Sequence, residues 1–405
     1  MNYCKECVYP IIAINLQINS DGICSACTAA ALFKKISDDE WKIRKKKFEK
    51  ILEDAKNNNK NNSNYDCVIP VSGGKDSYFQ THLIVKEYKL KPLLVTYHGN
   101  NYLPEGDYNR DRMREVFDAD HIVWGPSVEV LKKLNRICFE KMGDMNWHGH
   151  CGIFTAPHIV AVKFNIPLVI WGESPMDIAG MFHPDDYPEY TNRFRHDHAL
   201  RGYEWSDLIN FKNEKLSEKD MLWAKYPSDI EVINSKLRGI FVGNYFKWDP
   251  NKHAEKMKEL YGWKELEGSF QRTYRKISNL DDRYESGIHD LLKFIKFGYG
   301  RCSDHASKDI RSGYLTREQG IKLVKRYDHI VSSDLNYWLK YIGKDKDYFW
   351  KIADTFRDPR VWRIENNKWI KDTLWGKKRS YGKVYLTKEK IDLFKIRQKK
   401  INIIF

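Results

Sequence analysis

Residues 72–77 read Ser-Gly-Gly-Lys-Asp-Ser, and they follow directly on the apolar run of residues 67–71. A helix-like segment comes next, so the order along the chain is strand, glycine turn and helix start. Two adjacent glycines allow a tight turn in which several backbone N–H groups point at one anion, and the helix start adds positive charge. The sequence therefore predicts a phosphate-binding loop; a plain Gly-Gly turn before a helix is the alternative.

The side chains of this segment suit the same role. Lys75 carries a full positive charge, and Asp76 could hold a magnesium ion against the phosphates. The spacing differs from both GxxxxGK(S/T) and GxGxxG. It resembles the SGGxDS loop of the ATP pyrophosphatase (PP-loop) superfamily, whose members cleave ATP between the α and β phosphates. This resemblance implies that ATP is bound by Ser72, Gly73, Gly74, Lys75, Asp76 and Ser77.

The loop belongs to a segment in which apolar runs alternate with helix-like stretches. Near-continuous apolar strands that alternate with helices are typical of an α/β protein with a doubly wound parallel sheet. We therefore expect a PP-loop (HUP-like) ATP pyrophosphatase domain over residues 61–205. Its runs are residues 67–71, 92–97, 121–124 and 167–171, and its helix-like stretches are residues 77–88, 107–117, 128–141 and 155–164.

Ligands of such sheets bind beyond the carboxyl ends of the strands. This rule places residues 72–77, 97–102 and 172–175 around one pocket. Tyr97 and His98 are then expected to contact ATP, and Glu173 is expected to lie opposite the loop.

Two CxxC motifs near the N-terminus are separated by 16 residues. Four thiolates at this spacing suit a tetrahedral structural zinc ion. A redox dithiol or scattered core cysteines are the competing interpretations. We expect a zinc-binding module and a helix over residues 1–60, with the ligands Cys4, Cys7, Cys24 and Cys27.

Beyond residue 205 the strand pattern fades, so residues 206–405 are expected to form a mostly helical domain that contributes to the substrate site. Within it, residues 296–313 combine glycines with charged side chains and are expected to form a loop. This loop either closes on an anionic or sugar-like ligand or connects helices through ordinary salt bridges. Thr316 is predicted to open the next helix with a capping box.

Charge and hydropathy limit the partners. The net charge is +14, and residues 371–400 alone carry +8, which suits nucleic acid, an acidic substrate or a solvated surface. Apolar residues interleave with these charges, so a packed amphipathic end is expected. No apolar stretch approaches the ~20 residues that span a bilayer, and the first residues lack a hydrophobic signal core. We therefore expect a cytoplasmic protein without membrane contact.

Four features together resemble the N-acetyl sugar amidotransferases, PP-loop enzymes of surface-polysaccharide and flagellin-glycan pathways. They are the double CxxC, residues 72–77, the Trp-Gly-Glu of residues 171–173 and residues 296–325. This resemblance spans most of the chain. It implies that the acetamido group of an acidic or nucleotide-linked sugar becomes an acetamidino group, with ATP split into AMP and pyrophosphate. Such products serve lipopolysaccharide O-antigen or flagellin-glycan synthesis.

On this resemblance, Lys75 and a magnesium ion at Asp76 stabilise the departing pyrophosphate. Glu173 accepts a proton from ammonia or positions the sugar. Arg301, Asp304, His305 and Lys308 are the candidates for contact with the anionic sugar.

One stretch departs from the pattern of this family. Residues 174–180 read Ser-Pro-Met-Asp-Ile-Ala-Gly, without the Asn expected after Glu173 and with Asp177 where a second Glu is expected. The sugar is therefore left open between a nucleotide-linked diacetamido uronic acid and a nine-carbon nonulosonic acid.

A glutaminase active site is not expected in this chain. Met1 is followed by Asn2, and residues 149–152 lack one glycine of a GxCxG nucleophile turn, so Cys151 is predicted to be a core or pocket-wall residue. His148 and His150 beside it raise the alternative of a second metal site. The resemblance implies a separate glutaminase subunit, with a barrel protein to channel ammonia, and free ammonium as a substitute.

Two rival functions share these motifs. A PP-loop tRNA-modifying enzyme of the thiolation type fits the zinc knuckles, the loop and the basic surface. It usually needs further cysteines near the nucleotide, and those that remain here contain no further CxxC, so contact with nucleic acid is not expected. A non-catalytic zinc-and-nucleotide regulatory module would bind ATP without releasing pyrophosphate, and the intact Lys75-Asp76-Ser77 argues against it.

Overall fold

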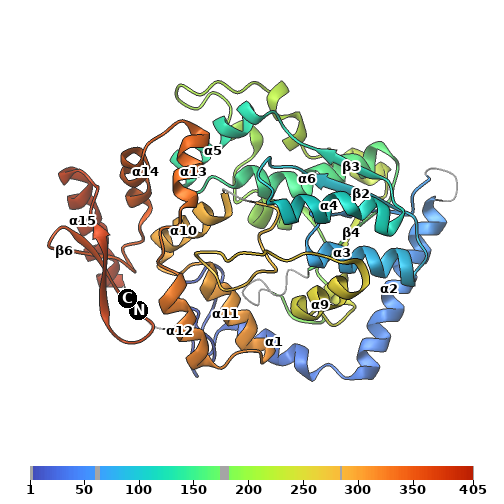
Figure 1. The fold of residues 1–405 in the computed structure, drawn as a ribbon, viewed down its shortest axis with the longest axis horizontal. Coiled ribbons are helices and arrows are strands. Elements are labelled where there is room, and N and C mark those ends of the chain that lie inside the picture. Colours follow the sequence, from blue (N-terminus) through green and yellow to red (C-terminus); the bar gives the residue numbers. More distant parts are fainter. Residues whose placement is uncertain (1–2, 60–63, 174–181, 283–284, 405) are drawn as a thin grey trace.

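A five-stranded parallel sheet forms the centre of the protein. The structure, a computed structural model, describes residues 3–59, 64–173, 182–282 and 285–404 (Figure 1). The strands lie in the order β3-β2-β1-β4-β5, and every neighbouring pair is parallel. The expected α/β class is thereby confirmed. The strand bounds are β1 Cys67–Pro70, β2 Pro92–Tyr97, β3 His121–Trp124, β4 Leu168–Trp171 and β5 Arg238–Phe241.

Helices cover both faces of this sheet, as the doubly wound pattern predicts. Their bounds are α2 Asp38–Asn59, α3 Lys75–His82, α4 Pro104–Phe117, α5 Val128–Met142, α6 Trp147–Lys163 and α9 Pro250–Tyr261. Val68 of β1 packs with α5 and α6, whereas Cys67 and Ile69 pack with α2, α3, α4 and α9. Because successive side chains of a strand point to opposite faces, burial of both faces requires the unbroken apolar run seen in the sequence.

The fifth strand was not predicted. The other four lie within one residue of their expected bounds, but β5 lies beyond residue 205, where the strand pattern was expected to end. Its Arg238 and Gly239 interrupt the apolar pattern, so pairing with β4 rather than local preference makes this segment a strand. The sheet therefore extends past the expected boundary.

The C-terminal part is mostly helical, with a small antiparallel sheet in the order β6-β7-β8 that the sequence did not predict. Phe394 of its last helix is buried against Trp362 and Trp369, so the basic end is packed as expected. The remaining bounds are α7 Asn192–Phe194, α8 Asp229–Asn234, α10 Glu285–Phe297, α11 Arg301–Ser312, α12 Arg317–Tyr327, α13 Asp334–Ile342, α14 Lys346–Ala353, β6 Arg363–Glu365, β7 Lys368–Asp372, β8 Lys378–Lys383 and α15 Lys388–Ile404.

The prediction of a loop over residues 296–313 is wrong, because most of this stretch is helix α11. Gly298 and Gly313 have φ angles of +73° and +82°, so they mark the ends of α10 and α11. Gly300 is the N-cap of α11. The glycines therefore separate helices instead of opening a long loop. Thr316 opens α12 as predicted, and its capping-box partner is Gln319.

The N-terminal residues pack against this helical part and not against the sheet alone. Tyr9 donates a hydrogen bond from its hydroxyl to Asp304 Oδ1 of α11 (3.1 Å). Arg317 of α12 donates to the carbonyls of Cys7 and Cys4 (3.1 and 3.2 Å). Helix α1, Ser25–Lys35, then runs beside α11, and α2 follows along the edge of the molecule (Figure 1).

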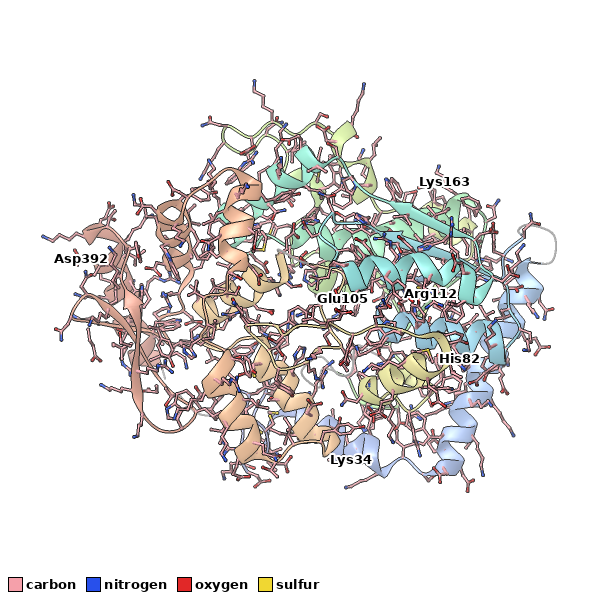
Figure 2. All side chains as sticks on the ribbon, in the orientation of Figure 1. Lys34, His82, Glu105, Arg112, Lys163 and Asp392 are labelled. Carbon is pink, nitrogen blue, oxygen red and sulfur yellow. The ribbon has the colours of Figure 1, made fainter. Side chains whose placement is uncertain are left out.

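Charged side chains gather on the outside of the molecule. Lys163 at the end of α6 and Asp392 on α15 are both exposed (Figure 2). Among the described residues, no helix combines the length and the apolar character that crossing a membrane requires.

Candidate functional site

The turn between β1 and α3 is held in one tight conformation. Gly73 has a φ of +80°, and a Cβ at this position would lie 2.5 Å from the backbone nitrogen of Arg110 in α4. Both the backbone conformation and the close approach of α4 therefore require glycine. Trp263 donates a hydrogen bond from Nε1 to the Gly73 carbonyl (2.9 Å) and anchors the turn. Gly74 then forms the N-cap of α3.

The first turn of α3 carries an ion-pair network. Lys75 is buried, and its Nζ lies 2.7 Å from Asp76 Oδ2. His253 of α9, which the sequence did not single out, places Nδ1 3.1 Å from Asp76 Oδ1. Burial opposes ionisation of Asp76, but Lys75 and His253 together hold its pKa well below the usual range. Ser77 donates from Oγ to the Gly74 carbonyl (2.8 Å), which closes the turn.

A cavity of about 330 Å³ opens at the carboxyl ends of β1, β2 and β4. The strand order reverses between β1 and β4, so the cavity lies at the topological switch point, where ligands bind in such sheets. The three loops expected around one pocket all reach it. They contribute Ser72, Asp76 and Ser77 after β1, Tyr97, Gly99, Asn101 and Tyr102 after β2, and Gly172 and Glu173 after β4.

Tyr97 and His98 differ in their positions. Tyr97 lines the cavity, and its hydroxyl lies 3.0 Å from His148 Nδ1. Burial raises the pKa of Tyr97 well above its ordinary value. His98 is not among the described lining residues; its ring stacks on Tyr102 with the centroids 4.9 Å apart. Burial lowers the pKa of His98, so its neutral form is favoured.

The C-terminal region contributes carboxyl groups that the sequence analysis missed. Asp281, Asp282 and Glu285 line the cavity, and Glu285 Oε2 lies 2.8 Å from His148 Nε2. Desolvation and the neighbouring Glu285 carboxylate hold the pKa of Asp282 well above its usual range. An Asp-Asp pair ahead of a helix is visible in the sequence, but nothing there indicates that it faces the β1–α3 turn.

Five carboxyl groups thus line one cavity, from Asp76, Glu173, Asp281, Asp282 and Glu285. Within the described chain, its lining includes neither lysine nor arginine. We call this space the acidic cavity. Its charge suits a cation, or a phosphate compound that brings a divalent cation with it.

Glu173 extends from the end of β4 and forms an ion pair with Lys308 of α11. The Glu173 side chain is 44% exposed, and the Lys308 side chain is 27% exposed. Gly172 just before it is tightly enclosed, since a Cβ there would lie 2.4 Å from Gln80 Oε1 and 2.9 Å from the Trp248 ring. The end of β4 is therefore fixed. The Glu173 carboxylate that follows it pairs with Lys308, which lies 135 residues further along the chain.

The other predicted sugar contacts do not line this cavity. Arg301 pairs with Asp290 (2.9 Å), and Asp304 pairs with Lys293. Thr273 Oγ1 lies 2.6 Å from His305 Nδ1, and burial holds the pKa of His305 well below its ordinary value. In the structure these three side chains stabilise the packing of α11 against its neighbours.

The four cysteines of the CxxC motifs are positioned to bind a metal ion. Their sulfur atoms lie within 4.8 Å of one another, with 3.9 Å between Cys4 and Cys27 and 3.7 Å between Cys7 and Cys24. Sulfur atoms around a tetrahedral zinc ion, at about 2.3 Å from the metal, are about 3.8 Å apart. The backbone N–H groups of Cys7 and Cys24 donate to the Cys4 sulfur (3.5 and 3.3 Å). The geometry therefore fits a buried structural zinc ion.

No second metal cluster is found among the described residues. His148 pairs with Glu285 and Tyr97, whereas His150 Nε2 lies 2.6 Å from Arg201 Nη2. Cys151 is fully buried in the core, and burial raises the pKa of its thiol to about 12. The burial agrees with the core position predicted for Cys151, and the raised pKa disfavours the thiolate form that a nucleophile needs. Residues 174–180, the stretch that departs from the family pattern and includes Asp177, lie outside the described residues.

Residues 268–374 match the family model described as LPS biosynthesis protein WbpG-like, C-terminal domain. This region contains Asp281, Asp282 and Glu285 of the acidic cavity as well as Lys308, the partner of Glu173. No match was found among curated protein sequences.

The metal site leads to a first prediction. The purified protein is expected to contain one zinc ion per chain, and Cys27→Ser should lose it and lower the free energy of unfolding by several kcal/mol, because a structural metal contributes folding energy. Metal analysis and urea unfolding measure both effects. Cys302→Ser, which changes a buried cysteine outside the cluster, is the matched control. Full zinc content in Cys27→Ser would show that the cluster is not the metal site.

The β1–α3 turn leads to a second prediction. Gly73→Ala should lower the free energy of unfolding by about 3 kcal/mol, because the methyl group adds a backbone clash to the cost of a positive φ. Gly376 has a similar φ of +78°, and no atom lies within 4 Å of the point that a Cβ would occupy there. Gly376→Ala should therefore cost only about 1 kcal/mol. Equal losses in urea unfolding would contradict the tight approach of Arg110.

Proposed function

We propose that the protein is an ATP-dependent, AMP-forming amidotransferase. It converts the acetamido group of an acidic or nucleotide-linked N-acetyl sugar into an acetamidino group, for lipopolysaccharide O-antigen or flagellin-glycan synthesis. One observation carries this proposal. The Ser-Gly-Gly-Lys-Asp-Ser turn lies at the switch point of a parallel sheet, in one cavity with residues of a region similar to an LPS biosynthesis protein.

The reaction needs ATP because an amide carbonyl is a weak electrophile and its oxygen a poor leaving group. The amide oxygen attacks the α-phosphorus of ATP, an O–P bond forms, and the bond to pyrophosphate breaks. Ammonia then attacks the carbon of the O-adenylyl imidate and gives up a proton. The C–O bond breaks, AMP leaves with the former amide oxygen, and the amidine remains on the sugar.

The β1–α3 turn has the groups that this first step needs. Backbone N–H groups of residues 72–74 and the start of α3 can stabilise the charge that develops on pyrophosphate. Lys75 is not among the described lining residues, but its Nζ lies 2.7 Å from Oδ2 of Asp76, which lines the cavity. The lining carboxylates would repel a bare triphosphate, so we expect ATP to enter as its magnesium complex. A magnesium ion bound at Asp76 would neutralise phosphate charge.

Glu173 is the candidate proton acceptor for the second step. It lines the acidic cavity at the end of β4, the strand that pairs with β1. A carboxylate at this place can take the proton that ammonia gives up as the C–N bond forms.

The ammonia comes from outside this chain in the proposed reaction. The buried Cys151 thiol with its raised pKa is unsuited to attack glutamine. A separate glutaminase subunit, with or without an ammonia-channelling barrel protein, is the proposed partner, and ammonium chloride should replace it in vitro.

The tRNA-thiolation alternative receives less support. Among the described residues that line the acidic cavity there is no cysteine, and Cys67, Cys138, Cys151 and Cys302 are all fully buried. A persulfide carrier or an iron–sulfur cluster needs thiols beside the nucleotide.

The test incubates the protein with ATP, magnesium, ammonium chloride and a panel of acetamido sugars. Formation of AMP, pyrophosphate and a sugar product in which NH replaces O is expected, as followed by pyrophosphate release and mass spectrometry. Lack of activity with every sugar, together with tight and salt-sensitive binding of tRNA, would favour the tRNA enzyme instead.

Within this assay, Lys75→Met should lower kcat for pyrophosphate release on the order of 10²-fold, because it removes a charge that stabilises the leaving group. Lys163→Met, at the exposed end of α6, is the matched control and should retain full activity. Unchanged kcat in Lys75→Met would contradict the assigned role of the turn.

A further inference from the structure

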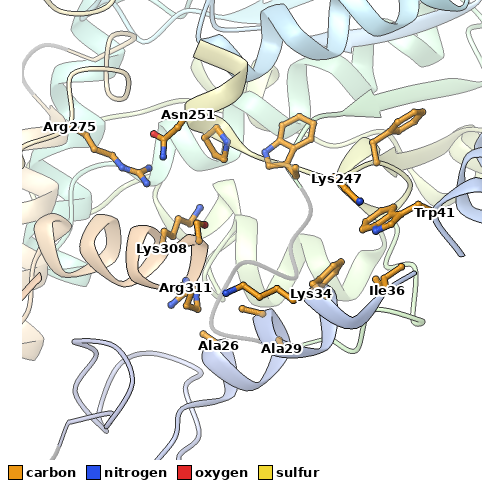
Figure 3. Close-up of a pocket in the computed structure, with 17 residues that line it drawn as sticks. Ala26, Ala29, Lys34, Ile36, Trp41, Lys247, Asn251, Arg275, Lys308 and Arg311 are labelled. Carbon is orange, nitrogen blue, oxygen red and sulfur yellow. The ribbon is translucent and has the colours of Figure 1, made fainter. Parts of the chain in front are cut away.

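A second cavity, of about 370 Å³, lies beside α11 (Figure 3). Its charge is opposite to that of the acidic cavity, because none of its described lining residues is Asp or Glu. We call it the basic cavity. Its lining cations are Lys34, Lys247, Arg275, Lys308 and Arg311, and its aromatic rings are Phe33, Trp41, Phe246 and Trp248.

Four parts of the chain build the basic cavity, and Arg275 comes from the segment between α9 and α10. Helix α1 contributes Lys34, the segment that leads into α9 contributes Lys247, and α11 contributes Lys308 and Arg311. Figure 3 shows Lys34, Lys308 and Arg311 around the same space. Since α1 begins between two cysteines of the metal cluster, the metal site fixes the wall that carries Lys34.

The basic and acidic cavities share a wall. Lys308 lines the basic cavity, Glu173 lines the acidic cavity, and the two side chains form an ion pair. Trp248 also lines the basic cavity and closely approaches Gly172, which lines the acidic one. A ligand that spans this wall could therefore place one end in each cavity.

The cations lie around one concave surface, where an anion can form charge-assisted hydrogen bonds with several of them. Lys34 and Lys247 are exposed, and Lys247 Nζ also lies 2.9 Å from Asp38 Oδ1, so an anion would share Lys247 with that carboxylate. Arg275 is already paired with the buried Asp309, which keeps its guanidinium in place at the cavity wall. The aromatic rings add flat apolar surface beside the charges, which suits a base or a sugar ring.

We propose that the basic cavity binds the anionic part of the sugar substrate while the acetamido group reaches the acidic cavity. This inference rests on the proposed function and adds a second site to it. The shared chemistry is an organic anion, either the diphosphate of a nucleotide-linked sugar or the carboxylate of an acidic sugar.

The Lys308–Glu173 ion pair links this binding to the reaction. An anion in the basic cavity competes with Glu173 for Lys308. When the anion takes Lys308, the Glu173 carboxylate is released toward the acidic cavity, where it can accept the proton of ammonia. Proton acceptance is thereby coupled to the presence of the sugar.

The first experiment measures binding by calorimetry, with magnesium and α,β-methylene-ATP present to fill the nucleotide site. UDP and N-acetylneuraminic acid serve as the two anionic probes, and N-acetylglucosamine is the neutral control. Binding of UDP alone would identify a nucleotide-linked sugar, and binding of the acid alone would identify a free acidic sugar. Absence of binding by both anions, or displacement of UDP by the ATP analogue, would overturn the proposal.

Exposed lysines at the basic cavity provide a variant that preserves the fold. Lys34→Gln with Lys247→Gln should weaken binding of the anionic probe at least about tenfold, the effect of losing charge-assisted contacts. Lys45→Gln with Lys46→Gln, on the exposed face of α2, removes the same charge elsewhere and should leave binding unchanged. Equal affinities in both double variants would overturn the assignment.

The Lys308–Glu173 ion pair predicts that substitutions of its two residues change the affinity for the anionic probe in opposite directions. Lys308→Met should weaken binding of the anionic probe about tenfold, because it removes a cation that contacts the anion. Glu173→Gln should strengthen the same binding, because it removes the carboxylate that competes for Lys308. A purely structural ion pair would weaken binding in both variants, which would refute the exchange.

The two proposals fail in different ways. Anion binding without AMP formation from any sugar would retain the basic cavity as a ligand site and refute the amidotransferase. If the protein is an active amidotransferase and Lys34→Gln with Lys247→Gln leaves its KM for the sugar unchanged, the proposed function stands. The proposal that the basic cavity binds the sugar is then refuted.

Discussion

The burial of β1 on both faces and along both edges is the constraint on which the rest of the structure depends. Val68 packs toward α5 and α6, Cys67 and Ile69 pack toward the opposite helices, and β2 and β4 pair with its two edges. The chain leaves this strand at the point where the strand order reverses, so its exit opens into a crevice. Gly73 makes that exit possible, because α4 approaches closer than any side chain allows.

Charge is separated across the wall at the end of β4. Carboxylates line the cavity at the switch point, and lysines and arginines line the cavity between α1 and α11. Such a separation favours different ligands on the two sides, a cation complex on one and an anion on the other. The Lys308–Glu173 ion pair is the one place where both charge types meet across this wall among the described lining residues. The four-cysteine cluster supports the arrangement, since α1 begins at it while Arg317 and Tyr9 hold the N-terminal residues to the helical part.

The local residue pattern was enough to predict the elements that are stabilised by burial of their own side chains. The four predicted strands, the cap at Thr316 and the cysteine cluster lie where residue spacing indicated. Helices follow the strands as predicted, but α6 begins at Trp147, eight residues before the predicted start at residue 155. Sequence reasoning failed where pairing partners decide the outcome. β5 becomes a strand by pairing with β4, and the hairpin strands β6 to β8 pair with one another in a region expected to be helical. It also failed at residues 296–313. Their glycines end two helices, but in the sequence the stretch has the same composition as a glycine-rich loop.

By itself, the sequence determined the α/β class, the tight glycine turn after β1, the four-cysteine cluster and the meeting of the loops after β1, β2 and β4. These follow from short-range spacing and from the rule that parallel strands end at one edge. Only the tertiary structure decided that Asp281, Asp282 and Glu285 line the same cavity, that His253 pairs with Asp76, and that Lys308 reaches Glu173 while Arg301, Asp304 and His305 pair elsewhere. The physical reason is that these contacts join side chains of different helices and loops, whether the partners are 11 positions apart, as Arg301 and Asp290 are, or 177 positions apart, as His253 and Asp76 are. Such contacts depend on how whole helices pack, and residue spacing carries no information about that packing.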